Sequence, residues 1–174
     1  ASMHKICTDL RLLAHENEIE EPFEEGQVGS SYMPFKKNPM REERNCALGR
    51  HPMALAFEAL FTQATQWLER TLDDSAARRI YIPEAFLATD GALLVLQNVV
   101  EGLTVYPAMI RRNLMRYLPF FASGPVMNAM VRAGGSRQEA HERLRAHALA
   151  ATMRMKEEAA DNDFMERLKT DEFF

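Results

Sequence analysis

One short stretch of the chain gathers residue types that could do chemistry, namely residues 29–39, GSSYMPFKKNP. Ser30 and Ser31 offer hydroxyl groups, and Lys36 and Lys37 add two positive charges to the same segment. Hydroxyls, cations and the free N–H groups of a helix that starts nearby favour the binding of a carboxylate or phosphate. Serine-rich segments before helices also serve simply as turns and caps, so both interpretations stay open on these residues alone.

The same segment could also carry a base. A serine abstracts a proton only where neighbouring donors and cations stabilise its alkoxide. With Lys36, Asn38 and backbone amides close by, a serine could remove a proton next to a carboxylate. The same donors would hold the doubly charged aci-carboxylate that results. The sequence permits this chemistry, although capping is the commoner role of such a loop.

A long helix is predicted to follow the loop. Asn38 can act as its N-cap and Pro39 fits the first helical position. The apolar rhythm then continues through residues 40–69, and Pro52 is expected to kink the helix.

Further helices are predicted by apolar periodicity and by end signals. Gly134 and Gly135 end one helix, and Ser136 with Glu139 forms a capping box for the next. No segment favours a strand. Besides residues 40–69, the predicted helices cover residues 3–13, 83–102, 107–117, 125–133, 136–158 and a short stretch near 163–166. The fold class is therefore all-α, with bundle architecture.

Composition narrows the function classes. The 174 residues carry a net charge of −4, which gives no reason to expect nucleic acid or an anionic membrane as a partner. No uninterrupted apolar run reaches the roughly 20 residues that span a bilayer. Cys7 and Cys46 have no metal-site or disulfide-framework spacing, and the five histidines show none either. We expect a cytoplasmic protein without metal or cofactor.

The charge is nevertheless uneven along the chain. Residues 1–35 hold two Lys or Arg against seven Asp or Glu, whereas residues 36–79 hold eight against six. A local basic cluster inside an acidic chain suits a small anionic ligand better than a long polyanion. A solvated surface of mixed charge is the alternative interpretation.

The segment GSSYMPFKKNP closely resembles the GSSxMPxKxNP signature of the fumarase/aspartase superfamily. Within that superfamily the chain resembles the adenylosuccinate lyase family over essentially its whole length. The segments that carry this closer resemblance are MHKICTDLRLLA, NPMREERNCALGRH, QWLERTLDDSAARR, EAFLATDGALLVLQNVVEGLTVYP and MVRAGGSRQEAHERLR. The resemblance implies that residues 1–105, with the signature loop 26–39, are part of a central helical bundle. Residues 106–174 would then be part of a smaller helical C-terminal domain.

The implied reaction is a β-elimination that releases fumarate from adenylosuccinate, or from the succinyl-aminoimidazole-carboxamide ribotide of purine synthesis. By motif position, Ser30 is the implied catalytic base and Ser31 assists it. Lys36 and Asn38 would bind the succinyl carboxylates, and Glu43 would orient the lysine or the loop.

The resemblance also implies a nucleotide site and an assembly. The positions that match nucleotide-binding residues are Arg44, Arg70, Ser75 and Arg79, which belong to the basic cluster. Arginine suits phosphate and carboxylate alike because its planar fork donates two parallel hydrogen bonds. Such enzymes are homotetramers in which each active site draws on three subunits.

Family members are several hundred residues long, so we expect this chain to be a central-to-C-terminal fragment. The histidine that acts as general acid lies in an N-terminal domain without a counterpart here. We therefore expect the isolated chain to be inactive.

Two other functions stay open. A related enzyme such as argininosuccinate lyase would share the loop, although residues 69–79 argue against it. A non-catalytic helical oligomerisation piece would share the fold, since a shortened bundle exposes apolar helix faces.

Overall fold

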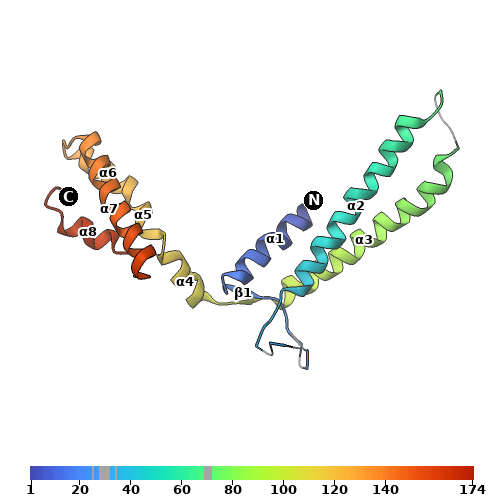
Figure 1. Ribbon diagram of the computed structural model, residues 1–174, viewed down its shortest axis with the longest axis horizontal. Coiled ribbons are helices and arrows are strands. Elements are labelled where there is room, and N and C mark those ends of the chain that lie inside the picture. Colours follow the sequence, from blue (N-terminus) through green and yellow to red (C-terminus); the bar gives the residue numbers. More distant parts are fainter. Residues whose placement is uncertain (25, 28–31, 34, 69–71) are drawn as a thin grey trace. The chain divides into compact units, whose positions relative to one another are not determined.

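The computed structural model describes residues 1–24, 26–27, 32–33, 35–68 and 72–174 (Figure 1). The chain divides into two compact units, Ala1–Tyr106 and Pro107–Phe174. Apart from one pair of two-residue strands, the regular structure in the described residues is helical, which confirms the all-α prediction.

The first unit is built from three helices: α1 (Ser2–His15), α2 (Met40–Thr65) and α3 (Asp74–Gly102). Helices α2 and α3 lie side by side along their lengths, and α1 packs beside the first half of α2 (Figure 1). The predicted start of α2 at Met40 is confirmed, and the helix ends at Thr65.

Helix α3 differs from the prediction at its start. It begins at Asp74 rather than near Pro83, so this proline lies inside the helix. A proline in a helix interior removes one backbone hydrogen bond, which made Pro83 look like a starting position. Extensive pairing with α2 offsets that loss.

A short antiparallel strand pair closes the first unit and was not predicted. It joins β1 (Ile19–Glu20) to β2 (Thr104–Val105), with Ile19 opposite Val105. Two residues are too few to show the alternation by which strands are recognised. Next to this pair, Gly102 lies against Pro22, where an added Cβ would come within 2.6 Å of the proline Cβ.

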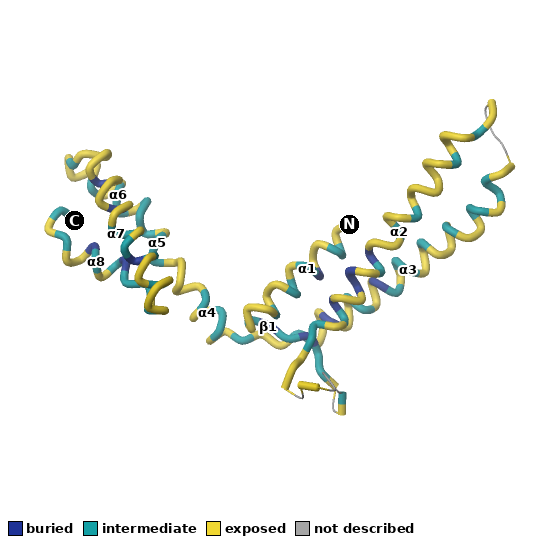
Figure 2. The backbone as a smooth tube through the Cα atoms, viewed as in Figure 1, coloured by how far each residue is buried: buried dark blue, intermediate teal, exposed yellow. Residues whose placement is uncertain are grey.

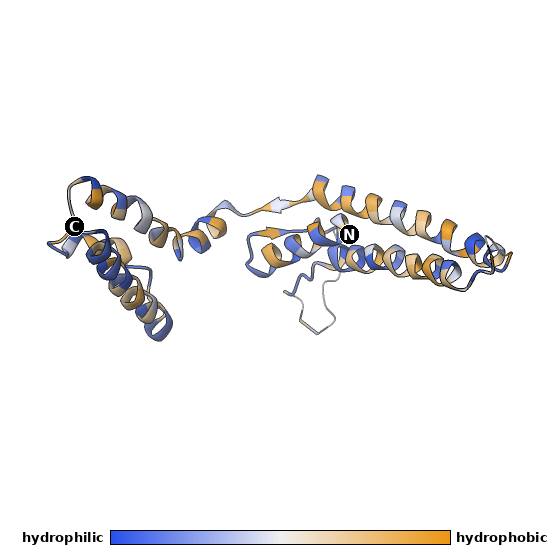
Figure 3. Cartoon of the chain, turned by 90° about the horizontal axis from the view of Figure 1, so that it is seen from above, coloured by the Kyte–Doolittle hydropathy of each residue, from blue (hydrophilic) through white to orange (hydrophobic). Residues whose placement is uncertain are grey.

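Burial in the first unit is concentrated where the three helices meet (Figure 2). The buried helical residues there are Cys7, Glu42, Asn45, Cys46, Gly49, Ala92 and Val99. Farther along, the two long helices expose large apolar side chains, among them Phe57, Leu60, Phe61, Phe86, Leu87 and Leu94. Apolar residues run along both helices (Figure 3). Among the described residues, α3 is the one helix long and apolar enough to cross a membrane by length and composition alone.

The second unit has its own apolar core. It consists of α4 (Pro107–Met115), α5 (Leu118–Phe121), α6 (Ser123–Arg132), α7 (Arg137–Glu158) and α8 (Phe164–Thr170). The core comprises Leu144, Ala151, Phe164 and Leu168. The predicted cap is confirmed, since the Ser136 hydroxyl accepts the backbone N–H of Glu139. Gly134 follows α6 with φ of +92°, a conformation that suits glycine.

Candidate functional site

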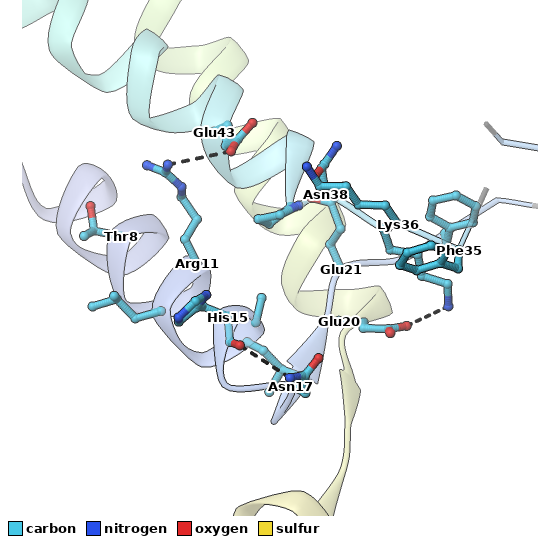
Figure 4. Close-up of a pocket in the computed structure, with 16 residues that line it drawn as sticks. Thr8, Arg11, His15, Asn17, Glu20, Glu21, Phe35, Lys36, Asn38 and Glu43 are labelled. Carbon is cyan, nitrogen blue, oxygen red and sulfur yellow. Dashed lines mark hydrogen bonds and ion pairs between the residues drawn. The ribbon is translucent and has the colours of Figure 1, made fainter. Parts of the chain in front are cut away.

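A pocket of about 690 Å³ lies in the first unit, beside the described end of the signature loop. Its walls come from α1, from the segment around β1, from residues 35–39 and from the first turn of α2 (Figure 4). Segments far apart in the sequence therefore come together around residues that were predicted to bind a ligand or to take part in catalysis.

Three of the predicted site residues, Lys36, Asn38 and Glu43, line this pocket. In the part of the chain that the structure describes, Lys36 forms no ion pair. Nor does the Asn38 side chain form a hydrogen bond there. One cation and one amide are thus available to an anionic ligand in the pocket.

Lys37, in contrast, is already neutralised. Its ammonium group lies 2.8 Å from the Glu20 carboxylate, which also accepts the Tyr106 hydroxyl at 3.0 Å. The hydrogen bond from Lys37 is the main cause that holds the pKa of Glu20 below its ordinary value, and it raises the pKa of Lys37 in turn. Of the two adjacent lysines, Lys36 is therefore the one suited to hold a ligand.

Glu43 pairs with Arg11, a residue that the sequence analysis missed. The guanidinium of Arg11 reaches from α1 to within 3.7 Å of the Glu43 carboxylate (Figure 4). It also donates a weak hydrogen bond to the Cys46 thiol at 3.9 Å. The available signal was a single arginine between two leucines in the sequence of α1.

The start of α2 is capped differently from the prediction. Asn38 is not the N-cap; Pro39 occupies that position and no side chain of the adjoining residues caps the helix. Instead both oxygens of the Glu21 carboxylate accept backbone N–H groups, from Met40 at 3.1 Å and from Arg41 at 2.7 Å. The helix end that was expected to bind a ligand anion already holds a carboxylate of the chain itself.

A second carboxyl group is buried close to this cap. Glu42 has no exposed surface, and neither of its oxygens has a hydrogen-bond partner in the described part of the chain. Burial, and next the neighbouring Glu21 carboxylate, raise the pKa of Glu42 to about 8. Glu42 is therefore neutral near pH 7, which spares the fold an unpaired buried charge.

The remaining predicted residues lie elsewhere or outside the described residues. Ser75 and Arg79 are on the first turns of α3, where Arg79 donates to the Ser75 hydroxyl and carbonyl oxygens. This end of the helix pair is the one far from β1 and from the start of α2 (Figure 1), and the 26 residues of α2 span about 39 Å. Arg44 is exposed on α2 and does not line the pocket. Ser30, Ser31 and Arg70 lie outside the described residues, and no group of metal-ligating side chains occurs among the described ones.

Comparisons with known proteins agree with the signature. The family model described as "Adenylosuccinate lyase C-terminus" matches residues 119–174, and the model described as "Lyase" matches residues 1–49. Adenylosuccinate lyase of Saccharomyces cerevisiae is 52% identical over 174 residues, which cover all of this chain and 36% of that protein. Adenylosuccinate lyase of Schistosoma mansoni is 50% identical over 175 residues, again all of this chain and 36% of the relative.

A solved structure has the same arrangement of helices. The 3-carboxy-cis,cis-muconate lactonizing enzyme from Pseudomonas putida matches with a TM-score of 0.70 and 26% identity, covering 88% of this chain and 33% of that enzyme. The chain thus spans about a third of the length of the curated relatives that it matches. By its sequence over its whole length, the chain belongs to the adenylosuccinate lyase family.

Proposed function

We propose that this chain supplies the base-bearing loop and one wall of the active site of an adenylosuccinate lyase. The reaction would be cleavage of adenylosuccinate to AMP and fumarate, with parallel cleavage of the succinyl-aminoimidazole-carboxamide ribotide. The observation that carries the proposal is that Lys36, which forms no ion pair among the described residues, and Asn38 line one pocket, and both belong to the signature segment that bears Ser30. No cofactor is required for this chemistry.

In the proposed mechanism Ser30 takes the proton from the succinyl β-carbon. The electron pair left behind first resides in the adjacent carboxylate as an aci-carboxylate, and it then forms the fumarate double bond as the C–N bond breaks. The departing nitrogen takes the electron pair of that bond and would be protonated by the general acid of the N-terminal domain. Lys36 and Asn38 would hold the charge that develops, with Ser31 assisting. Glu43 would orient this group of residues, itself anchored by Arg11.

The proposed site needs more than one copy of the chain. Ser75 and Arg79, proposed with Arg44 and Arg70 to bind the nucleotide, are separated from the pocket by most of the length of α2. A nucleotide is far shorter than that separation. This geometry supports a site shared between copies of the chain, and the family resemblance adds the proposal of a cytoplasmic homotetramer in which three subunits contribute to each site. Residues 1–105 would form part of its central bundle and residues 106–174 part of its C-terminal domain.

The decisive experiment compares the full-length protein that carries this chain with its Ser30→Ala variant on adenylosuccinate. A general base contributes about 10²–10⁴-fold to the rate, so we expect kcat to fall by at least that factor while substrate still binds. Ser123→Ala is the matched control, because the Ser123 hydroxyl only donates to the Phe120 carbonyl in the second unit. A Ser30→Ala variant with full activity would refute the assignment of the base. If the full-length protein cleaved argininosuccinate and not adenylosuccinate, the proposed substrate would be wrong.

The isolated chain is expected to be inactive, because the proposed general acid comes from elsewhere in the family's structure. Cleavage by residues 1–174 alone at the rate of the full-length protein would overturn this part of the proposal.

A second role, as a helical oligomerisation piece, is favoured by one specific observation. Phe57 is 60% exposed, Phe61 66% and Phe86 73%, all along the outer parts of α2 and α3. Large contiguous apolar surfaces on helices typically mark an interface. Light scattering of the isolated chain should therefore find oligomers, and a clean monomer at high concentration would contradict this role.

A further inference from the structure

The two arms of the signature loop are joined at its base by a set of contacts that the sequence did not indicate. Glu21, which precedes the loop, is only 6% exposed and caps α2, which follows it. A carboxylate that accepts two backbone N–H groups at the positive end of a helix makes hydrogen bonds of the stronger kind. The Glu21 carboxylate therefore fixes where the chain re-enters regular structure after the loop.

Two ion pairs flank this cap and join the same two arms. On one side the Glu20 carboxylate holds Lys37 at 2.8 Å, and on the other Glu24 holds Arg41 at 2.6 Å. Arg41 is fixed further by a hydrogen bond of 2.6 Å to the Asn98 side chain of α3. We call the contacts of Glu20, Glu21 and Glu24 with the second arm the glutamate clasp.

The clasp encloses the residues proposed to hold the substrate. Lys37, bound by Glu20, stands between Lys36 and Asn38 in the chain, and Met40, bound by Glu21, follows two residues later. Asn38 thus lies between two fixed points of the segment, and Lys36 directly precedes the first of them. Neither side chain is held by a contact of its own within the described residues, so their placement depends on these fixed points.

The charge around Glu21 fits a permanent cap. Arg41 is beside it and is shared with Glu24, and buried Glu42 stays protonated near neutral pH. Of the remaining acidic side chains at the helix start, Glu21 accepts from the end amides and Glu43 in the first turn is paired with Arg11. Glutamine at position 21 could accept only through its carbonyl oxygen, and alanine could not accept at all.

We propose that Glu21 is a positioning residue for the elimination, which holds Lys36 and Asn38 at the pocket by capping α2 from the opposite arm of the loop. The proposal rests on the proposed function and adds to it a pocket residue whose two carboxylate oxygens are already engaged by the backbone of α2. Small displacements of binding groups cost as much as about 10²-fold in rate, so the cap is expected to matter for catalysis.

The test uses the full-length protein with Glu21→Ala and Glu21→Gln, and with Glu157→Gln as a matched control on the exposed surface of α7. We expect kcat/KM for adenylosuccinate to fall about 100-fold in Glu21→Ala and about 10-fold in Glu21→Gln, more through kcat than through KM. Hydrogen exchange of the Met40 and Arg41 amides should quicken in the same order. Glu157→Gln should change neither quantity.

The outcomes separate the cap from the reaction. Unchanged exchange at Met40 and Arg41 in Glu21→Gln would show that there is no cap, whatever the activity. Faster exchange with kcat/KM within twofold of the wild type would overturn the positioning role. If Glu21→Ala does not fold, Glu21→Gln, which has the same shape, decides both questions. A wild type that is silent on adenylosuccinate would refute the proposed function, while the exchange data would still judge the cap.

Discussion

The two units of the chain differ in the polar residues that they bury and in the apolar residues that they expose. The second unit places Phe164 and Leu168 in an apolar core and keeps its charged groups at the surface. The first unit buries Glu42 and Asn45 and exposes phenylalanines along its two long helices. Folding normally removes apolar surface from water. The exposed apolar side chains of the first unit therefore do not contribute fully to the stability of its fold.

The two units are therefore held together by different kinds of contact. The second unit is held by contacts among its own residues. The first unit is held near the pocket by a polar network, and its outer part offers an exposed apolar surface. Polar burial accordingly coincides with the candidate site, and apolar exposure with the proposed interface.

The largest expected effect comes from replacing one phenylalanine of each unit with alanine. Phe164 is fully buried, with its ring centroid 5.3 Å from that of Phe120. Phe164→Ala should lower the free energy of unfolding of the second unit by about 3–5 kcal/mol. Phe57→Ala, at a position 60% exposed, should change the stability of the monomer by less than about 1 kcal/mol and weaken self-association instead.

Urea unfolding followed by circular dichroism, at concentrations where the chain is monomeric, measures the first quantity. Light scattering measures the second. Equal losses of stability from the two alanine variants would remove the contrast between the units.

The buried Glu42 gives the next largest effect, and it depends on pH. Its pKa is raised from 4.5 to about 8 in the fold, so the native state binds the proton more tightly than the unfolded chain. The stabilisation is complete below about pH 4.5 and is lost as the pH rises to about 8. Glu42→Gln cannot titrate. As the pH rises from 4.5 to 8, its free energy of unfolding should therefore increase relative to that of the wild type, by an amount on the order of 3 kcal/mol.

Urea midpoints at several pH values between 4.5 and 8.5 test this prediction. Glu157→Gln serves as the control, since that carboxylate is exposed. If the urea midpoints of the wild type and of Glu42→Gln changed with pH in the same way, Glu42 would be solvated and the polar network would be open to water.

A smaller effect is expected at Gly102, where the strand pair meets α3. An alanine Cβ there would lie 2.6 Å from the Cβ of Pro22, and the rigid proline ring cannot rotate away. Gly102→Ala should cost about 1–2 kcal/mol and shift the segment that leads into the clasp. Gly91→Ala is the matched control in the same helix. Nothing lies within 4 Å of the added Cβ there, so it should stabilise by about 0.5–1 kcal/mol. If both alanine variants changed the free energy of unfolding in the same direction, Pro22 would not be in contact with residue 102.

Sequence was most informative where structure is set by neighbours in the chain. The cap at Ser136 and the glycine after α6 both follow from signals within a few residues. The start of α2 was predicted to within one residue, since Pro39 was expected in the first helical position and the helix begins directly after it at Met40.

Contacts between distant segments escaped prediction for a physical reason. Glu21 reaches Met40 across 19 residues, and a run of glutamates gives no sign of which one will turn inward. Arg11 and Glu43 likewise meet only because α1 packs on α2. Local patterns identified Lys36, Asn38 and Glu43 as candidates, while the residues that support them depend on tertiary packing.

The smallest predicted effect compares the two ways in which this chain caps a helix. Ser136 caps α7 from the adjoining position, with its hydroxyl accepting the Glu139 N–H at 3.4 Å. Ser136→Ala should therefore cost about 1 kcal/mol and quicken exchange only in the first turn of α7. Ser136→Asp keeps an acceptor and adds a charge that the helix dipole favours, so it should match the wild type or exceed it. Because the Ser136 cap joins no distant segments, its loss should leave kcat/KM of the full-length protein unchanged, in contrast to the loss of Glu21. A fall in activity from Ser136→Ala would mean that helix caps in this protein affect catalysis through general stability, and the distinction between the two caps would then be lost.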